Sequence, residues 1–127
     1  MRKLLIAAAI VAPVIAVSAV AQQTIKRTPL QTVDFPAGYN VVSVIAEIPP
    51  GVCAGRHTHP GVESSYVMEG SGILKVEGQP DRTVKAGESF QIPPGVPHDG
   101  CVPAGESYKI LATYIVEKGK PLATPAP

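Results

Sequence analysis

The sequence carries little charge, and the two signs almost cancel. Its 127 residues include 11 lysines and arginines against 10 aspartates and glutamates, a formal net charge of +1 at pH 7. The lysines and arginines form no cluster along the chain. Nucleic acids and anionic membrane surfaces attract proteins through basic patches, so we expect neither to be a partner of this protein.

Helical periodicity is also lacking after the first 21 residues. Short segments rich in β-branched residues are instead separated by turns that contain many of the 12 glycines and 14 prolines. This pattern predicts an all-β domain, a double-sheet jelly roll or a barrel. The expected strands cover residues 32–35, 39–48, 54–59, 64–69, 73–77, 82–85, 89–92 and 107–117.

The length allows one domain with a hydrophobic core. We expect an extended N-terminal arm over residues 22–40, a β-barrel over residues 41–117 and a disordered tail over residues 118–127. Pro29 and Pro36 interrupt the arm, which leaves room for only a short strand. The tail has no pattern of apolar residues that could pack against the barrel.

The first 21 residues have the composition of a secretory signal peptide. A short basic start is followed by an apolar run over residues 4–17 and by Ala19-Val20-Ala21, an Ala-x-Ala cleavage site. The alternative is an uncleaved membrane anchor, which needs about 20 apolar residues and tolerates Pro13 poorly at this length. Cleavage would lower the net charge to −1, because Arg2 and Lys3 are lost. We therefore expect a periplasmic or secreted protein with no membrane partner after cleavage.

Histidine is scarce, and all three copies lie in two turn-rich segments. His57 and His59 are two residues apart, so on a strand both rings project from the same face. A turn at residues 60–61 can return the carboxylate of Glu63 toward them. Imidazole nitrogen and carboxylate oxygen together suit Mn, Fe, Ni, Cu or Zn, whereas calcium requires more oxygen ligands. The segment therefore predicts a site for one divalent transition metal.

The spacing in this segment resembles the first motif of the cupin family. Gly51 is followed after five residues by His57-x-His59, after three more by Glu63, and after six more by Gly70. The resemblance extends over residues 41–116, with the two motifs separated only by residues 71–86. It implies a double-stranded β-helix, the jelly-roll barrel of small type-2 cupins.

The third histidine lies in a segment that resembles the second cupin motif. Gly87 is followed by Pro93-x-Gly95 and then by His98. The resemblance implies four metal ligands, His57, His59, Glu63 and His98. One position departs from the family pattern, because the asparagine that often closes the second motif is Val102 here. The hydrogen bond of that side chain is therefore missing beside His98.

Several activities are compatible with such a site. With a redox metal it resembles cupin dioxygenases, and with a non-redox metal it resembles cupin isomerases and lyases; a noncatalytic protein that binds a metal or small molecule is the third possibility. By alternation Tyr66 faces away from Glu63 and Arg56 faces away from His57. Because few other ionisable groups remain, we expect a dioxygenase-type oxidoreductase acting on a small molecule. The resemblance also implies a homodimer, for which the outward Tyr66 and Met68 are candidate contacts.

Cys53 and Cys101 are the only cysteines, and each lies close to an expected ligand. A fold that brings His98 to His57 can also bring the two sulfurs together. Export to an oxidising compartment favours a disulfide between them. The alternative is a free thiol that faces the metal pocket, because Cys53 shares strand parity with His57 and His59.

Overall fold

The computed structural model describes residues 24–127, which form nine β-strands and no helix, so the all-β prediction is confirmed. The predicted signal peptide lies outside the described residues. Among residues 24–127 no helix could span a membrane. The strands are β1 (Lys26–Asp34), β2 (Tyr39–Ile48), β3 (His57–Thr58), β4 (Gly61–Val76), β5 (Arg82–Lys85), β6 (Ser89–Ile92), β7 (His98–Cys101), β8 (Tyr108–Glu117) and β9 (Thr124–Pro125).

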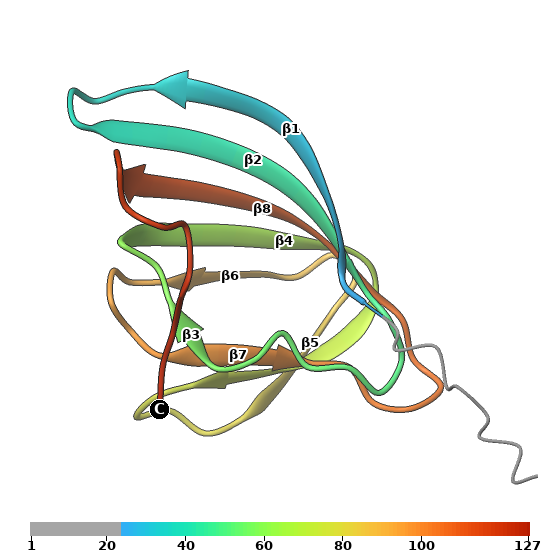
Figure 1. Cartoon of the computed structure of the whole chain (residues 1–127). Helices are drawn as coiled ribbons and strands as arrows, with labels where there is room; N and C mark the ends of the chain where they lie inside the picture. Colours follow the sequence, from blue (N-terminus) through green and yellow to red (C-terminus); the bar gives the residue numbers. More distant parts are fainter. Residues whose placement is uncertain (1–23) are drawn as a thin grey trace, which may run out of the picture.

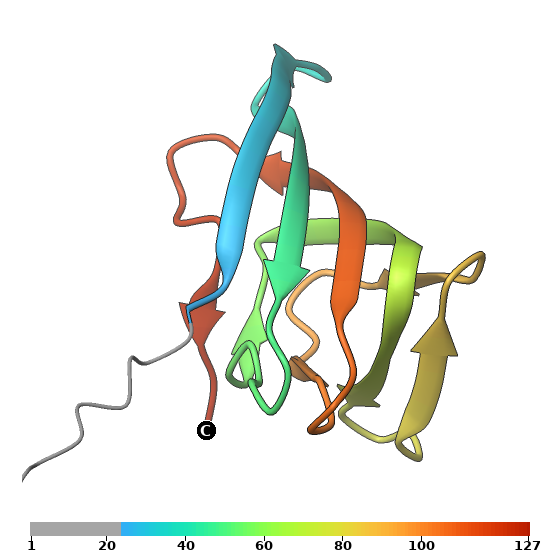
Figure 2. The same ribbon diagram turned by 90° about the vertical axis from the view of Figure 1, so that its right-hand side faces the viewer.

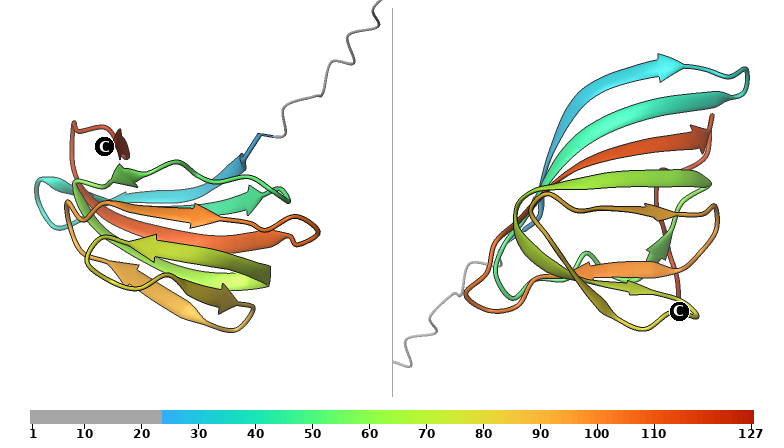
Figure 3. Two further views of the ribbon diagram at one scale, coloured as in Figure 1. Left: turned by 90° about the horizontal axis from the view of Figure 1, so that it is seen from below. Right: turned by 180° about the vertical axis from the view of Figure 1, so that it is seen from behind.

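The strands form one curled sheet that folds back on itself as a half-barrel, the double-stranded β-helix that was predicted (Figures 1 and 2). Their order is β1-β2-β8-β4-β7-β3-β9, and β5 and β6 each pair with β4. In Figure 1 an upper layer of β1, β2, β8, β6 and the start of β4 faces a lower layer of β3, β7 and β5. Figure 3 shows the same curl from below and from behind.

The strand β4 connects the two layers because it is 16 residues long and bends. Its first part pairs with β8 and β6, and its last part pairs with β5 and β7. Gly70 lies at the bend with a φ of 73°, where a Cβ atom would be 1.8 Å from the carbonyl oxygen of Ser107. The turn expected at residues 70–72 is therefore wrong. The strand continues because β5 and β7 supply ladder partners on both sides, which local composition does not reveal.

Buried apolar side chains from both layers fill the interior. The main core cluster comprises Ala46, Ile48, Val67, Leu74, Val84, Phe90, Ile92, Val102, Tyr108, Ile110 and Ala112. Alternation along β2 and β8 directs every second residue inward, so Ala46 and Ile48 of β2 and Ile110 and Ala112 of β8 are buried. Burial of apolar area in this interior stabilises the half-barrel and holds the two layers together.

The N-terminal arm is more regular than expected. β1 spans nine residues and pairs with β2 over its length, from Lys26 opposite Glu47 to Asp34 opposite Asn40. The predicted strand, at residues 32–35, is therefore shorter than the observed β1. Pro29 is accommodated because β1 is the end strand of the sheet order, where one side of the backbone needs no ladder partner, and the register shifts between Pro29 and Gln31.

The tail over residues 118–127 is ordered in the structure, so the prediction of disorder is wrong. Its strand β9 pairs with β3, with Thr58 opposite Thr124. The backbone N–H of Ala126 also donates to the carbonyl oxygen of Arg56 at 3.0 Å. The tail is held by its backbone hydrogen bonds with β3, which would otherwise be a free edge, and by hydrogen bonds from the side chains of His59 and Arg56.

Candidate metal centre

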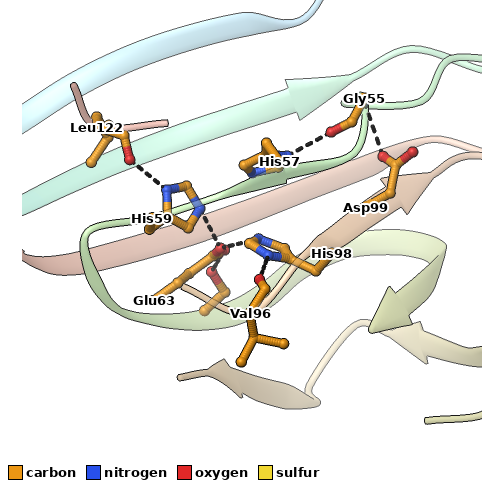
Figure 4. Close-up of polar contacts among 9 residues, drawn as sticks. Gly55, His57, His59, Glu63, Val96, His98, Asp99 and Leu122 are labelled. Atoms are coloured by element: carbon orange, nitrogen blue, oxygen red, sulfur yellow. Dashed lines mark hydrogen bonds and ion pairs between the residues drawn. The ribbon is translucent and has the colours of Figure 1, made fainter. Parts of the chain in front are cut away.

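The four predicted ligands lie together between the two layers. Their candidate ligand atoms are all within 4.8 Å of one another. The pairing of β3 with β7 sets His57 opposite His98, and Glu63 projects toward them from β4 (Figure 4). His59 follows directly after β3. The side chains of His59, Glu63 and His98 are buried, whereas His57 is partly exposed.

Backbone carbonyl groups orient all three imidazole rings. The Nδ1 atom of His57 lies 2.6 Å from the carbonyl oxygen of Gly55, and that of His98 lies 2.9 Å from the carbonyl oxygen of Val96. The Nδ1 atom of His59 lies 2.6 Å from the carbonyl oxygen of Leu122, in the tail. A carbonyl can only accept, so each Nδ1 carries a proton and donates it. The three Nε2 atoms are therefore the ones that can face a metal.

Glu63 is the carboxylate at the centre of the cluster. Its Oε2 atom lies 3.0 Å from Nε2 of His59 and 3.1 Å from Nε2 of His98. Its Oε1 atom accepts a hydrogen bond of 2.6 Å from the hydroxyl of Ser65. Ser65 shares the inward face of β4 with Glu63, and its role was not predicted from the sequence. This hydroxyl fixes the orientation of the carboxylate between the two rings.

The cluster changes the protonation of its own members. Burial acts to raise the pKa of Glu63, but the hydrogen bonds from His59, His98 and Ser65 outweigh it and lower that pKa to about 2. Burial likewise opposes the charged form of His98, yet its contacts with Glu63 and the carbonyl of Val96 raise its pKa overall. The pKa of His57 is lowered, mainly by burial. The carboxylate of Glu63 is therefore ionised, and the rings of His59 and His98 are arranged around it.

These donors fit a divalent transition metal ion. Three Nε2 atoms and one carboxylate oxygen converge from separate segments, and each imidazole is oriented by a hydrogen bond to its other nitrogen, as is usual for metal-ligating histidine. Nitrogen-rich sites of this kind suit Mn, Fe, Ni, Cu or Zn better than calcium. His57, His59, Glu63 and His98 would be the residues that hold the ion.

Val102 has a structural role where the family pattern often has asparagine. Its side chain is 3% exposed and packs in the hydrophobic core. Its backbone N–H donates to Val52 at 2.9 Å, and its carbonyl accepts from Gly51 at 2.8 Å. Orientation of His98 comes instead from the carbonyl of Val96 and from Glu63. The substitution therefore leaves His98 held.

Cys53 and Cys101 are paired, as the sequence predicted, with their sulfurs 2.08 Å apart. The disulfide links the loop before β3 to the end of β7, so it joins the two segments that carry His57 and His98. A second link lies beside it, because the backbone N–H of Gly55 donates to Oδ1 of Asp99 at 3.0 Å. The alternative of a free thiol facing the metal pocket is therefore not realised in the structure.

A cavity of about 60 Å³ opens beside the cluster. Its walls are largely apolar, with Ile48, Leu74, Phe90 and Ile110 among them, but it is also lined by two phenols, Tyr108 and Tyr114, and by Arg27. None of these three ionisable residues was predicted from the sequence. The prediction that Tyr66 lies outside the site is confirmed, because Tyr66 is 49% exposed and does not line the cavity.

The two phenols are close to the charge of the cluster. The rings of Tyr114 and His59 are 4.8 Å apart between centroids. Burial, with the charge of Glu63 as the next cause, raises the pKa of Tyr108 to about 12 and also raises the pKa of Tyr114. Both hydroxyls are thus protonated donors at neutral pH. Alternation places residues 108 and 114 on one face of β8, but only the pairing of Glu63 with Tyr114 shows that this face lines the site.

Comparison with known proteins identifies the family of this half-barrel. The family model described as a cupin domain matches residues 44–114, more than half of the chain, so the chain belongs to the cupin family. No curated protein matches the sequence significantly.

Solved structures with the same fold include proteins of several activities. A polyketide cyclase, RemF from Streptomyces resistomycificus, is 23% identical with a TM-score of 0.67, over 80% of this chain and 70% of the cyclase. A cupin-like protein from Thermotoga maritima is 24% identical with a TM-score of 0.68, over 80% and 75%. The DMSP lyase DddQ from Ruegeria pomeroyi is 20% identical with a TM-score of 0.63, over 68% of this chain but only 43% of the lyase. At these identities the likeness concerns the fold.

Proposed function

We propose that this protein is a metal-dependent enzyme that performs acid–base chemistry on a small organic molecule, as a lyase, cyclase or isomerase. The observation that carries the proposal is the position of Tyr108 and Tyr114 on the wall of the cavity that also exposes His57, Glu63 and His98. The lyase and the cyclase among the structures of the same fold support the choice of reaction class. The ligands of the metal would be His57, His59, Glu63 and His98.

Each part of the site would have a separate task. A divalent ion held by these four residues would supply a positive charge able to polarise a substrate oxygen. The apolar walls exclude water and strengthen electrostatic interactions inside the cavity. The carboxylate of Glu63 lines the same space and would accept the proton of an acidic C–H bond. The hydroxyl of Tyr108 or Tyr114 would donate a proton to a leaving or carbonyl oxygen, and the other hydroxyl would position the substrate. Ser65 keeps the carboxylate of Glu63 turned toward the rings.

The dioxygenase expected from the sequence is the second candidate. That expectation depended on a shortage of ionisable groups near the ligands, and the structure adds two phenols and an arginine to the cavity. The supply of proton donors favours acid–base chemistry. A noncatalytic binding protein is the third candidate. The dioxygenase and the binding protein each predict a result that differs from that of the acid–base enzyme in the experiment below.

The test is hydrogen exchange into substrates with acidic C–H bonds. Metal-loaded protein would be incubated in deuterated water with a panel of ketones, oxo acids and sulfonium compounds, and NMR would record deuterium uptake and elimination. We expect metal-dependent exchange that falls about 100-fold or more in Tyr108→Phe or Tyr114→Phe, the usual contribution of a general acid or base. Tyr66→Phe is the matched control, because Tyr66 lies on the outer face.

Other outcomes would contradict the proposal. Oxygen uptake without deuterium exchange would establish the dioxygenase. Tight binding of metal and small molecules with neither reaction would establish the binding protein. Equal activity in all three tyrosine variants would show that the phenols have no part in the chemistry.

Export and dimer formation are further parts of the proposal. The disulfide between Cys53 and Cys101 supports export, because such bonds persist mainly in oxidising compartments. In N-terminal sequencing of the protein recovered from an exporting cell, the first residue should be Gln22.

The side chains of Tyr66 and Met68 on the outer face of β4 are 49% and 40% exposed, and they support pairing between copies. Light scattering at high concentration should then give the mass of a dimer, and a monomeric mass would contradict it.

A further inference from the structure

Arg27 lies where the cavity beside the cluster meets a second cavity. The second cavity has a volume of about 270 Å³ and is partly walled by the tail, through Ala123 and Pro125. Arg27, Ala54 and His57 line both spaces. The two cavities therefore share a wall that includes a ligand histidine and a guanidinium group.

Two guanidinium groups, those of Arg27 and Arg56, line the second cavity, and no side-chain carboxylate does. Arg56 is already engaged, because it pairs with Glu77 and donates through Nε to the carbonyl oxygen of Pro127 at 2.6 Å. Arg27, by contrast, takes part in none of the side-chain hydrogen bonds or ion pairs that residues 24–127 form with one another. Its donors are thus available to a molecule in the cavities.

The register of β1 against β2 explains why Arg27 faces the site. Arg27 lies opposite Ala46, which lines the cavity beside the cluster, whereas its neighbour Lys26 lies opposite Glu47 on the other face and pairs with it at 3.2 Å. The pKa of Tyr114 also reflects this position. Burial and the charge of Glu63 raise that pKa, and the charge of Arg27 opposes them, so the guanidinium lies within electrostatic reach of the phenol.

We infer that the substrate is a small organic anion whose carboxylate, or similar oxyanion, pairs with Arg27 while its other end reaches the four-ligand cluster. This inference rests on the proposed function, because it names the class of molecule on which the site acts. A guanidinium binds a carboxylate through two parallel hydrogen bonds, which fixes orientation as well as charge. The cavity beside the cluster is small and apolar, so it fits a short hydrocarbon segment between the two polar ends.

The test compares two variants that remove one positive charge from adjacent residues. Arg27→Gln removes the charge on the cavity face, and Lys26→Gln removes it on the opposite face. The probes are succinate, which has a carboxylate at each end, and propionate, which has one. Isothermal titration would measure their binding to Zn²⁺-loaded protein, and a Zn²⁺ titration of each variant would show that the cluster is intact.

We expect succinate to bind Arg27→Gln about tenfold or more weakly than the original protein, the loss expected for a hydrogen bond to a charged group. Lys26→Gln should bind succinate unchanged, and Arg27→Lys should retain part of the affinity. The affinity for propionate should be the same in Arg27→Gln as in the original protein, because its single carboxylate would bind the metal.

Unchanged succinate affinity in Arg27→Gln, or an equal loss in Lys26→Gln, would overturn the inference. If circular dichroism shows that Arg27→Gln does not fold, the affinity of Arg27→Lys for succinate tests the inference instead. Lysine keeps the positive charge but cannot form two parallel hydrogen bonds, so full succinate affinity in that variant would exclude a bidentate pair. These results are separate from the proposed function. Deuterium exchange can succeed while Arg27 proves irrelevant, and succinate can require Arg27 in a protein that catalyses nothing.

Discussion

The carbonyl oxygen of Leu122 gives the C-terminal tail a direct part in the candidate metal centre. It accepts a hydrogen bond of 2.6 Å from Nδ1 of His59, which turns Nε2 toward the other ligands. Ending the chain at Lys120 would remove this acceptor together with β9. Ending it at Pro125 would keep both and remove only the hydrogen bonds of the last two residues with Arg56.

The expected magnitude follows from the position of this hydrogen bond. A group that orients a metal-ligating histidine contributes about 10–100-fold to metal affinity, which corresponds to about 1.4–2.7 kcal/mol. Loss of the carbonyl would let the ring of His59 rotate or change its tautomer. We therefore expect the protein that ends at Lys120 to bind Zn²⁺ 10–100-fold more weakly than the full chain. The protein that ends at Pro125 should bind it nearly as tightly as the full chain.

Competition with a chromogenic chelator measures the Zn²⁺ affinity of all three proteins. Far-ultraviolet circular dichroism and thermal denaturation would establish that each is folded, since the hydrophobic core includes no tail residue. Full affinity after the loss of residues 121–127 would refute the reasoning. An equal loss in both shortened proteins would also refute it, because the contacts with Arg56 and not the carbonyl of Leu122 would then be responsible.

Three further predictions concern stability. The pKa of Glu63 is about 2 in the folded metal-free protein and 4.5 ordinarily. Its ionised carboxylate therefore contributes on the order of 3 kcal/mol to the unfolding free energy above pH 4.5, and this contribution is lost as the pH falls toward 2. Thermal denaturation at a series of pH values should show this loss of stability, and in Glu63→Gln this pH dependence should disappear. An unfavourable φ costs roughly 1–3 kcal/mol, and Gly70→Ala should lower the unfolding free energy measured in urea by more than this, because its Cβ atom would also collide with Ser107. Gly78→Ala has a similar φ but open space around it, so it should lower the unfolding free energy only by the cost of the φ. Reduction of the disulfide, which closes a 48-residue separation, should lower the unfolding free energy by about 2–4 kcal/mol, and an unchanged melting temperature with reductant would contradict this.

Local sequence patterns predicted much of the fold. Strands at residues 82–85 and 89–92 have the expected bounds, and β2 likewise begins at Tyr39 and ends at Ile48. β2 is rich in β-branched residues, and glycine or proline lies close to the ends of all three segments; these are signals read over a few neighbouring residues. Long-range pairing was the source of error. β4 continues through Gly70, and the tail becomes β9, because partners distant in the sequence satisfy their backbone groups.

The sequence by itself determined which residues could bind a metal. The spacing of His57, His59 and Glu63, with His98 in the second motif, is a property of chain order, and alternation with a turn is enough to bring neighbours to one side. The same local logic correctly turned Tyr66 outward.

Only the tertiary structure decided what surrounds those ligands. Tyr114 reaches the site because β8 pairs with β4 in one register, Arg27 because β1 pairs with β2, and Leu122 because the tail docks on β3. A shift of one residue in the ladder of β8 with β4 or of β1 with β2 would turn Tyr114 or Arg27 to the opposite face. Register is set by the packing of the whole sheet and by backbone hydrogen bonds between distant segments, and so the proton donors and the cation of the cavity could be found only in the folded chain.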